Sequence, residues 1–239
     1  MLKTPLKDQN HLFHSIPTSE WERLLPHIEA VEMPLGMVMS EPGMKLSHAY
    51  FPSTAIVSVL HALENGTSAE VAAIGNEGLI GISIFMGGGT SSSSCIVKSA
   101  GLGYRIKSHI LLEEFNYSTP LMHLFLRFTQ ALITQITQTA VCNRHHLLEQ
   151  QLCRLLLVNL DRLPSNQLLM TQELIARLLG VRREGVTEAA LKIQSAGFIK
   201  YARGQVTILD RIGLEKRSCE CYKVVKTEYQ RLLPERMAI

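Results

Sequence analysis

The sequence lacks any apolar run of the roughly 18 residues that a membrane-spanning helix requires. Its first ten residues, MLKTPLKDQN, contain neither the apolar stretch nor the cleavage site of a secretory signal peptide. We therefore predict a cytoplasmic protein with no membrane association. Apolar residues make up 46% of the 239 residues and charged residues 19%, which is typical of a soluble globular chain with a sizeable core.

The sequence also lacks the cysteine pattern of a disulfide framework or a zinc knuckle. Its five cysteines are odd in number and include no Cys-x-x-Cys pair. We interpret Cys219 and Cys221 as adjacent exposed thiols of a C-terminal helix, with a redox or metal role as the alternative. Because lone spacings of this kind are weak signals, we predict no metal site and no cofactor.

Strong net charge is absent as well, since the formal value is only +3. The distribution is uneven, however: Thr171 to Arg217 contains nine Lys and Arg against five Asp and Glu. The basic character therefore lies in the C-terminal fifth of the chain, where an acidic partner such as nucleic acid is expected.

The first half of the chain changes texture near Val31. Before it, apolar residues at helical spacing predict helices from Asn10 to Ala30, with Thr18 or Ser19 as an N-cap. From Val31 to about Ile110, short β-rich runs alternate with Gly, Pro, Asn and Ser breaks, which predicts a compact β-barrel or jelly roll. Asn65-Gly66 is its clearest hairpin turn.

A long helix follows Pro120 and continues to about His145. One stripe of this helix has the spacing of a coiled-coil seam, and a second apolar flank lies beside it. The first face predicts a homodimer and the second a contact with the chain's own β-rich part; a single core helix is the alternative. The seam residues are Met122, Leu126, Thr129, Ile133, Ile136 and Ala140, and the flank residues are Leu121, Leu124, Phe125, Phe128 and Leu132.

Further helices follow, from His145 to Leu163 and then on both sides of Gly180, which permits a sharp turn. Thr171 stands where an N-cap is expected. The helix after Gly180 has one face of small and apolar residues for packing, namely Val186, Ala189, Ala190 and Ile193. Its other face is polar, with Arg182 at the helix start, Arg183 and Lys192 at the edges, and Glu184, Thr187 and Glu188 between them.

The segment after these helices predicts a β-hairpin. Phe198–Tyr201 and Val206–Leu209 have strand character, and the intervening turn Ala202–Gln205 carries Arg203 at its tip. A helix-turn-helix followed by a basic wing is typical of a module that places its second helix in the major groove of DNA and its wing on the phosphate backbone. The alternative is a packed helical pair with a solvated charged face.

The whole order of elements resembles the Crp/Fnr family of bacterial transcription regulators, most specifically in "LLGVRREGVTEAALKIQSAGFI". The resemblance implies an α+β protein: a sensor domain of helices and β-roll (jelly-roll, cyclic-nucleotide-binding-like) over residues 1–119, a dimerisation helix over 120–144, and a winged helix-turn-helix over 145–239. It further implies a homodimer on a palindromic, inverted-repeat operator, with RNA polymerase as a candidate partner.

The predicted DNA contacts combine this resemblance with the polar face. Arg183 and Glu184 match the Arg-Glu pair common in the family, whereas Glu188 stands where a second arginine is usual. A carboxylate can accept from a cytosine amine, so we predict a sequence preference different from the family's best-known one. Glu188 is either a second reader or an intrahelical partner of Arg183. The full set is Thr171 and Gln172, near phosphate, with Arg182, Arg183, Glu184, Thr187, Glu188 and Arg203.

The resemblance also suggests a ligand site in the β-roll. Glu77, in "IGNEGLIG", matches the carboxylate that holds a ribose in nucleotide-binding members, and Ser92 and Ser93 stand where those members have Arg-Ser. No Arg or Lys occurs between Leu46 and Val97, so a buried phosphate would lack a guanidinium. We therefore expect an unknown effector other than a cyclic nucleotide, with a cyclic-nucleotide-responsive regulator as the alternative.

An enzyme is the rival from another class, in the form of a cupin-like barrel with a metal site. His48 and His61 stand alone in the β-rich segment, without the clustered ligands that such chemistry needs. No Gly-x-Ser-x-Gly elbow and no P-loop occur either. We therefore predict that the protein is not an enzyme. A DNA-binding protein that lacks any effector is the third reading.

Overall fold

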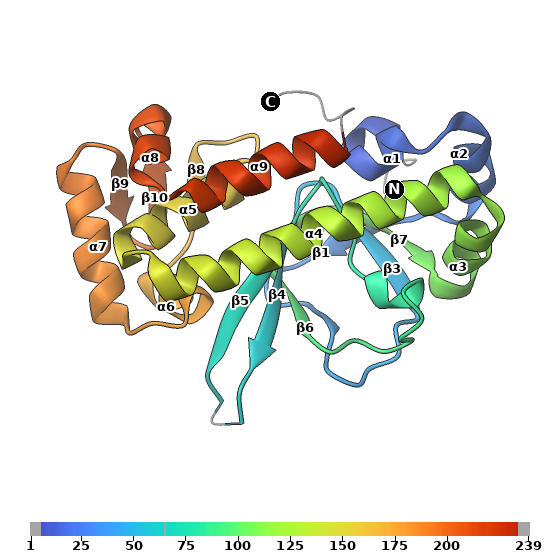
Figure 1. Ribbon diagram of the computed structural model, residues 1–239, viewed down its shortest axis with the longest axis horizontal. Coiled ribbons are helices and arrows are strands. Elements are labelled where there is room, and N and C mark those ends of the chain that lie inside the picture. The colour runs from blue at the N-terminus through green and yellow to red at the C-terminus, as the bar shows by residue number, and fades with distance from the viewer. Residues whose placement is uncertain (1–5, 65, 234–239) are drawn as a thin grey trace. The chain divides into compact units, whose positions relative to one another are not determined.

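The computed structural model describes residues 6–64 and 66–233 (Figure 1). The chain forms two compact units. Unit 1 comprises residues 6–59, 74–133 and 229–233 of the described part, and unit 2 comprises 60–64, 66–73 and 134–228. Among the described residues, no helix combines the length and the apolar character needed to cross a membrane.

Short helices open unit 1, as predicted, but with different boundaries. They are η1 (Lys7–Gln9), α1 (His11–Ser15), α2 (Thr18–Leu24) and η2 (Leu25–His27). The predicted cap at Thr18 or Ser19 is wrong, because Pro17 occupies the N-cap position of α2 and Ser19 donates to Glu20 at 2.6 Å. The side-chain cap lies earlier in the chain, at Asn10.

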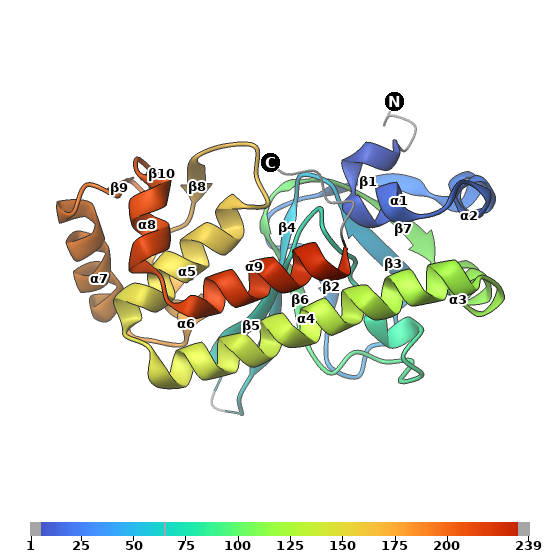
Figure 2. The same ribbon diagram turned by 45° about the horizontal axis from the view of Figure 1, so that its top comes forward.

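Two sheets form the β-rich part of the chain, which confirms the predicted fold class; their strands belong to unit 1 except for the end of β4 and nearly all of β5. The first has the order β1-β7-β3, with β1 (Glu29–Met33), β3 (His48–Pro52) and β7 (Gly101–Lys107). The second has the order β2-β6-β4-β5, with β2 (Val38–Ser40), β6 (Ser94–Ser99), β4 (Ile56–Ala62) and β5 (Ser68–Ile74), all labelled in Figure 2. The short 3-10 helix η3 (Ile82–Ile84) lies between β5 and β6 in the chain. Asn65, of the predicted turn between β4 and β5, lies outside the described residues.

Aromatic side chains hold the core of unit 1. Phe13 of α1 lies 4.5 Å from Phe51 of β3 between ring centroids, and 5.1 Å from Trp21 of α2. Phe85 stacks on Phe115 of α3 (Ser108–Tyr117) at 4.9 Å. Ring pairs in this range add to the free energy gained by burying their apolar area, so this cluster fixes the helices against the first sheet.

The helix α4 (Thr119–His145) is continuous for 27 residues (Figures 1 and 2). The predicted flank residues are all buried within the chain. Along the predicted seam, Leu126 and Ile133 are 41% and 53% exposed. Thr129 is an exception, since it is buried and donates to the carbonyl of Phe125, so its placement in the seam was wrong.

Unit 2 contains, besides most of β5 and the end of α4, the elements that follow α4 in the chain. They are α5 (Leu148–Leu160), β8 (Gln167–Leu169), α6 (Gln172–Leu179), α7 (Arg183–Ser195), β9 (Ile199–Ala202), β10 (Gln205–Ile208), α8 (Arg211–Arg217) and α9 (Glu220–Leu232), whose last residues belong to unit 1. Helix α5 is buried from Gln151 to Leu160 and contacts α6, α7 and α8. It is therefore the central helix of this unit.

Asn10 is expected to be a strong determinant of the stability of unit 1. Its side chain is fully buried, donates to the carbonyls of Pro52 (2.8 Å) and Gly78 (3.0 Å), and caps α1. Asn10→Ala should lower the free energy of unfolding by about 2–4 kcal/mol, because it removes a cap and leaves buried carbonyls without donors. Denaturant titration followed by the fluorescence of Trp21, the only tryptophan, reports on this unit.

The matched control is Asn116→Ala, at an exposed asparagine of α3 in the same unit. It should leave the midpoint of the titration almost unchanged. Equal effects of the two substitutions would contradict the role assigned to Asn10.

Candidate nucleic-acid interface

The first helix of the candidate interface, α6, has defined ends. The Thr171 hydroxyl accepts a hydrogen bond from the amide of Leu174 at 3.1 Å and so caps the helix, as predicted. At the other end Gly180 has φ +67°, a left-handed conformation that glycine adopts without steric cost. The chain can therefore turn sharply into α7.

The second helix, α7, buries one face against its neighbours. Val186, Ala189, Ala190 and Ile193 are at most 5% exposed, which confirms the predicted packing face. Gly185 lies on the same side, where an added Cβ would be 2.9 Å from Cδ2 of Leu148 at the start of α5. Small residues therefore let α7 approach α5 closely, and the opposite, polar face is left to solvent.

A two-residue hairpin follows, as predicted. Arg203 and Gly204 have φ +50° and φ +77°, and β9 and β10 are joined in register at Ala202 and Gln205. Positive φ at both central residues is the property of a type I′ turn, which matches the twist of the strands. The sheet has a third strand, β8, that pairs with β10 and was not predicted.

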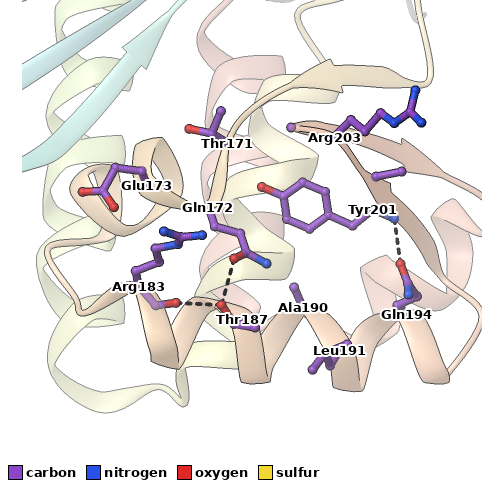
Figure 3. A pocket seen from close by; sticks show the side chains of 12 residues that line it. Thr171, Gln172, Glu173, Arg183, Thr187, Ala190, Leu191, Gln194, Tyr201 and Arg203 are labelled. Atoms are coloured by element: carbon purple, nitrogen blue, oxygen red, sulfur yellow. Dashed lines mark hydrogen bonds between the residues drawn. The ribbon is translucent and has the colours of Figure 1, made fainter.

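Helices α6 and α7 and the β9–β10 hairpin, which forms the wing, enclose a groove of about 490 Å³ (Figure 3). Five of the eight predicted DNA-contact residues line it: Thr171, Gln172, Arg183, Thr187 and Arg203. The groove also contains residues that were not predicted as contacts, namely Glu173, Ala190, Leu191, Gln194, Tyr201, Ala202 and Gly204. The fold thus gathers the start of α6, the outer side of α7 and the tip of the wing around one concave surface.

Internal hydrogen bonds set the shape of the groove floor. The Thr187 hydroxyl lies 2.9 Å from Oε1 of Gln172 and 3.1 Å from the carbonyl of Arg183 (Figure 3). Gln172 therefore uses its carbonyl oxygen within the protein, and its amide nitrogen is the part that can donate to a ligand. The hydrogen bond from Thr187 orients the side chain of Gln172.

Tyr201 forms the wall between α7 and the wing, and sequence reasoning missed it. Its hydroxyl donates to the carbonyl of Met170 at 2.7 Å, and its amide donates to Oε1 of Gln194. Burial raises the pKa of this hydroxyl. The alternation of β9 was the available signal, because it places Tyr201 on the same face of the strand as the buried Ile199 and opposite to the exposed Lys200.

The other predicted contacts lie outside the groove. Arg182 and Glu184 are exposed at the start of α7, where Arg182 occupies the N-cap position without a side-chain cap bond. Glu188 forms an ion pair with Lys192 at 2.8 Å, and this hydrogen bond lowers the pKa of the Glu188 carboxyl. The intrahelical partner of Glu188 is therefore Lys192, and not Arg183 as the sequence allowed.

The residues suggested for a ligand site in the β-roll are placed as follows. Glu77 is 1% exposed, and its carboxylate accepts from the amide of Gly75 at 3.1 Å. Ser92 is exposed in the segment before β6. The amide of Ser93 donates to the Ser91 hydroxyl at 3.2 Å, and its carbonyl accepts from that hydroxyl at 2.6 Å. Glu77 and Ser93 thus both form hydrogen bonds with residues two positions away in the chain.

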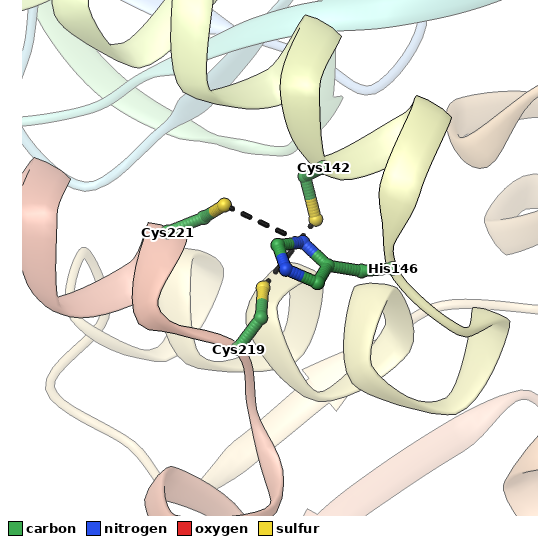
Figure 4. Close-up of side chains that lie close together, drawn as sticks. All are labelled: Cys142, His146, Cys219 and Cys221. Carbon is green, nitrogen blue, oxygen red and sulfur yellow. Dashed lines mark hydrogen bonds between the residues drawn. The ribbon is translucent and has the colours of Figure 1, made fainter.

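The C-terminal cysteines differ most from expectation. Cys219 and Cys221 are 4% and 0% exposed, so their interpretation as exposed thiols was wrong. They lie with Cys142 and His146 in one group (Figure 4). The hydrogen bond between the thiols of Cys142 and Cys219 lowers the pKa of Cys219 to about 5 and raises that of Cys142, whereas burial raises the pKa of Cys221 to about 11.

Comparison with known proteins places the helix-turn-helix in a family. Residues 150–217 match the model of the Crp-like helix-turn-helix domain. No curated protein matches the chain. Among solved structures, a Crp/Fnr-family transcriptional regulator from Eubacterium rectale is similar, with 17% identity, a TM-score of 0.69, and coverage of 87% of this chain and 98% of that one.

Two further structures have the same fold. A Crp/Fnr-family transcriptional regulator from Thermus thermophilus has 18% identity and a TM-score of 0.65, covering 80% of this chain and 98% of that one. The c-di-GMP-responsive global regulator CLP from Xanthomonas campestris has 18% identity and a TM-score of 0.64, covering 80% and 99%. The resemblance to Crp/Fnr regulators is thereby confirmed for the fold and for the helix-turn-helix domain.

Proposed function

We propose that this chain, with its Crp-like helix-turn-helix domain and Crp/Fnr fold, is a sequence-specific DNA-binding transcription regulator that acts as a homodimer on an inverted repeat. The observation that carries the proposal is the groove between α6, α7 and the wing, whose lining includes Arg183 and Arg203. Its lining offers cationic and amide donors to phosphate and base edges, as a DNA surface requires.

In this proposal α7 enters the major groove with its first turns leading. Its buried face is occupied by packing within unit 2, so the face with Arg183, Glu184 and Glu188 is the one that can meet base edges. The Glu188–Lys192 pair lies on the solvent side of the same helix and can exchange for contacts with DNA at small cost, since exposed ion pairs contribute little. Arg203, at the wing tip, contacts a phosphate in this proposal.

The dimer is supported by the uncovered stripe of α4. Leu126 and Ile133 are 41% and 53% exposed in the single chain, on a helix whose opposite face is buried. Covering such a stripe with the same stripe of a second copy removes apolar surface from water. Two copies would present two α7 helices to half-sites about 34 Å apart.

The proposed regulator responds to an input other than a cyclic nucleotide. The carboxylate of Glu77 is buried, and the segment with Ser92 and Ser93 offers hydroxyls and amides where a guanidinium is needed to hold a phosphate.

Arg183 should read a base, and its loss should affect specific binding. The operator is first obtained by selection of bound duplexes from a random pool. Arg183→Ala should then weaken binding to this operator by about 1–3 kcal/mol, roughly 5- to 150-fold, and relax the preference at one position of each half-site. Fluorescence anisotropy at fixed salt measures both effects, and an unchanged operator affinity would contradict the assignment of α7 as the reading helix.

Arg203 provides the contrast within the same experiment. Arg203→Asn removes the charge and tolerates the positive φ of the turn. It should weaken operator and unrelated DNA to a similar extent and reduce the slope of log affinity against log salt by about 1. Lys45→Ala, an equal loss of charge in unit 1, is the control and should change neither quantity.

Ile133 should be required for the dimer. Ile133→Glu places charges opposite each other in the proposed seam, so light scattering should return a mass near 26.7 kDa where the parent gives twice that value. Affinity for the full operator should fall, while affinity for a single half-site should persist. Arg127→Glu, at an exposed position of α4 away from the stripe, is the control. A parent chain that is itself monomeric at the same concentration would refute the dimer.

A further inference from the structure

Four potential metal ligands converge in unit 2, from two parts of the chain. Cys142 lies in the last turn of α4, and His146 directly follows the end of that helix, where its backbone amide donates to the carbonyl of Cys142 at 3.0 Å (Figure 4). Cys219 and Cys221 are on either side of Glu220 at the start of α9. Three thiols and one imidazole are a ligand set that structural zinc sites use.

The geometry of the group suits one ion. The four ligand atoms all lie within 4.8 Å of one another. The two sulfurs of Cys142 and Cys219 are 3.5 Å apart, and Sγ of Cys221 is 3.6 Å from Nδ1 of His146. Around a tetrahedral zinc with ordinary bond lengths, sulfur–sulfur edges are about 3.8 Å and sulfur–nitrogen edges about 3.6 Å.

The surroundings orient the ligands. Nδ1 of His146 faces the thiols, and Nε2 lies 3.3 Å from Oε1 of Glu220. A carboxylate on the far nitrogen of a metal-bound histidine fixes both its tautomer and its ring orientation. The side-chain amide nitrogen Nε2 of Gln151 donates to the carbonyls of Cys142 (3.3 Å) and His146 (2.9 Å), so the segment that carries two ligands is held from α5.

We propose that Cys142, His146, Cys219 and Cys221 bind one Zn²⁺ ion in a closed, structural site that joins the end of α4 to the start of α9. This site goes beyond the proposed function, since none of its residues lines the DNA groove. All four positions come from the protein and the three cysteines are buried, so no place is left for a water or substrate as in a catalytic site.

Two other uses of the group fit the geometry less well. An iron–sulfur cluster needs room between its ligands for several irons and inorganic sulfides, whereas these ligand atoms have the spacing of a single ion. A disulfide between Cys142 and Cys219 would not explain why Cys221 and His146 lie in the same group, or why Glu220 contacts His146. The hard ions Mg²⁺ and Ca²⁺ prefer oxygen ligands.

The metal content of the full chain, purified under reducing conditions without air, tests the site. Elemental analysis should find about one zinc per chain. Cys142→Ser and Cys219→Ser should lose it, whereas Cys95→Ser and Cys153→Ser, at buried cysteines outside the group, should retain it. Because a ligand variant can fail to fold, the parent chain is also stripped of metal and titrated with Co²⁺, which should give thiolate-to-cobalt absorption that saturates at one equivalent and is displaced by Zn²⁺.

Several results would overturn the proposal. They are a parent chain without zinc whose metal-free form takes up neither Zn²⁺ nor Co²⁺, a folded Cys219→Ser variant that retains its ion, and iron accompanied by acid-labile sulfide. A Cys142–Cys219 disulfide in protein prepared without air would also refute it. None of these measurements involves DNA, so the site and the proposed function can fail separately.

Glu220 should act as a positioning residue. Glu220→Gln should weaken zinc affinity about 10- to 100-fold in competition with a chelator, while saturation still requires one equivalent and the cobalt spectrum keeps its thiolate bands. Glu41→Gln, an exposed acid of unit 1, is the control and should leave the affinity unchanged. An unaltered affinity in Glu220→Gln would show that the contact with His146 does not support a bound ion.

Discussion

The packing of α7 on α5 is the constraint on which the interface depends. Ala189 and Ala190 place small side chains on the buried face of α7, where most helices have larger ones. Gly185 allows Leu148 of α5 to approach the first turn of α7. Once this face is buried, the 3.6-residue period of the helix determines which of the remaining residues face solvent. The polar face and the groove beside the wing are therefore consequences of a few small side chains.

Local patterns in the sequence were sufficient for those parts of the fold that local interactions determine. The Thr171 cap, the left-handed Gly180 and the Arg203-Gly204 turn each rest on contacts within a few residues, and all three were predicted from residue type. The buried face of α7 follows from its period alone. The strand β8 was missed because three residues carry too little pattern, and its pairing with β10 depends on a distant segment.

The metal-ligand group could not be predicted for the same physical reason. Cys142 and Cys219 are 77 positions apart, and only tertiary packing places their sulfurs in contact. A Cys-x-Cys spacing on its own is compatible with two exposed thiols. Only the packing of the start of α9 within unit 2 buries Cys219 and Cys221 and brings them to the other two ligands, and no single stretch of sequence encodes that packing. Likewise, Glu188 was considered as a second reader or as a partner of Arg183, whereas the structure pairs it with Lys192, four residues further along the helix.

The proposed zinc site lies next to the surface on which α7, the proposed reading helix, packs. Helix α5 begins two residues after His146, and its first residue, Leu148, is the one that Gly185 of α7 approaches. A tetrahedral ion would fix the end of α4 relative to α9, and through Gln151 it would fix the first turn of α5. With the end of α4 and the first turn of α5 held by the ion, α5 could not move relative to α9. The orientation of α7, which packs on α5, would then be fixed as well.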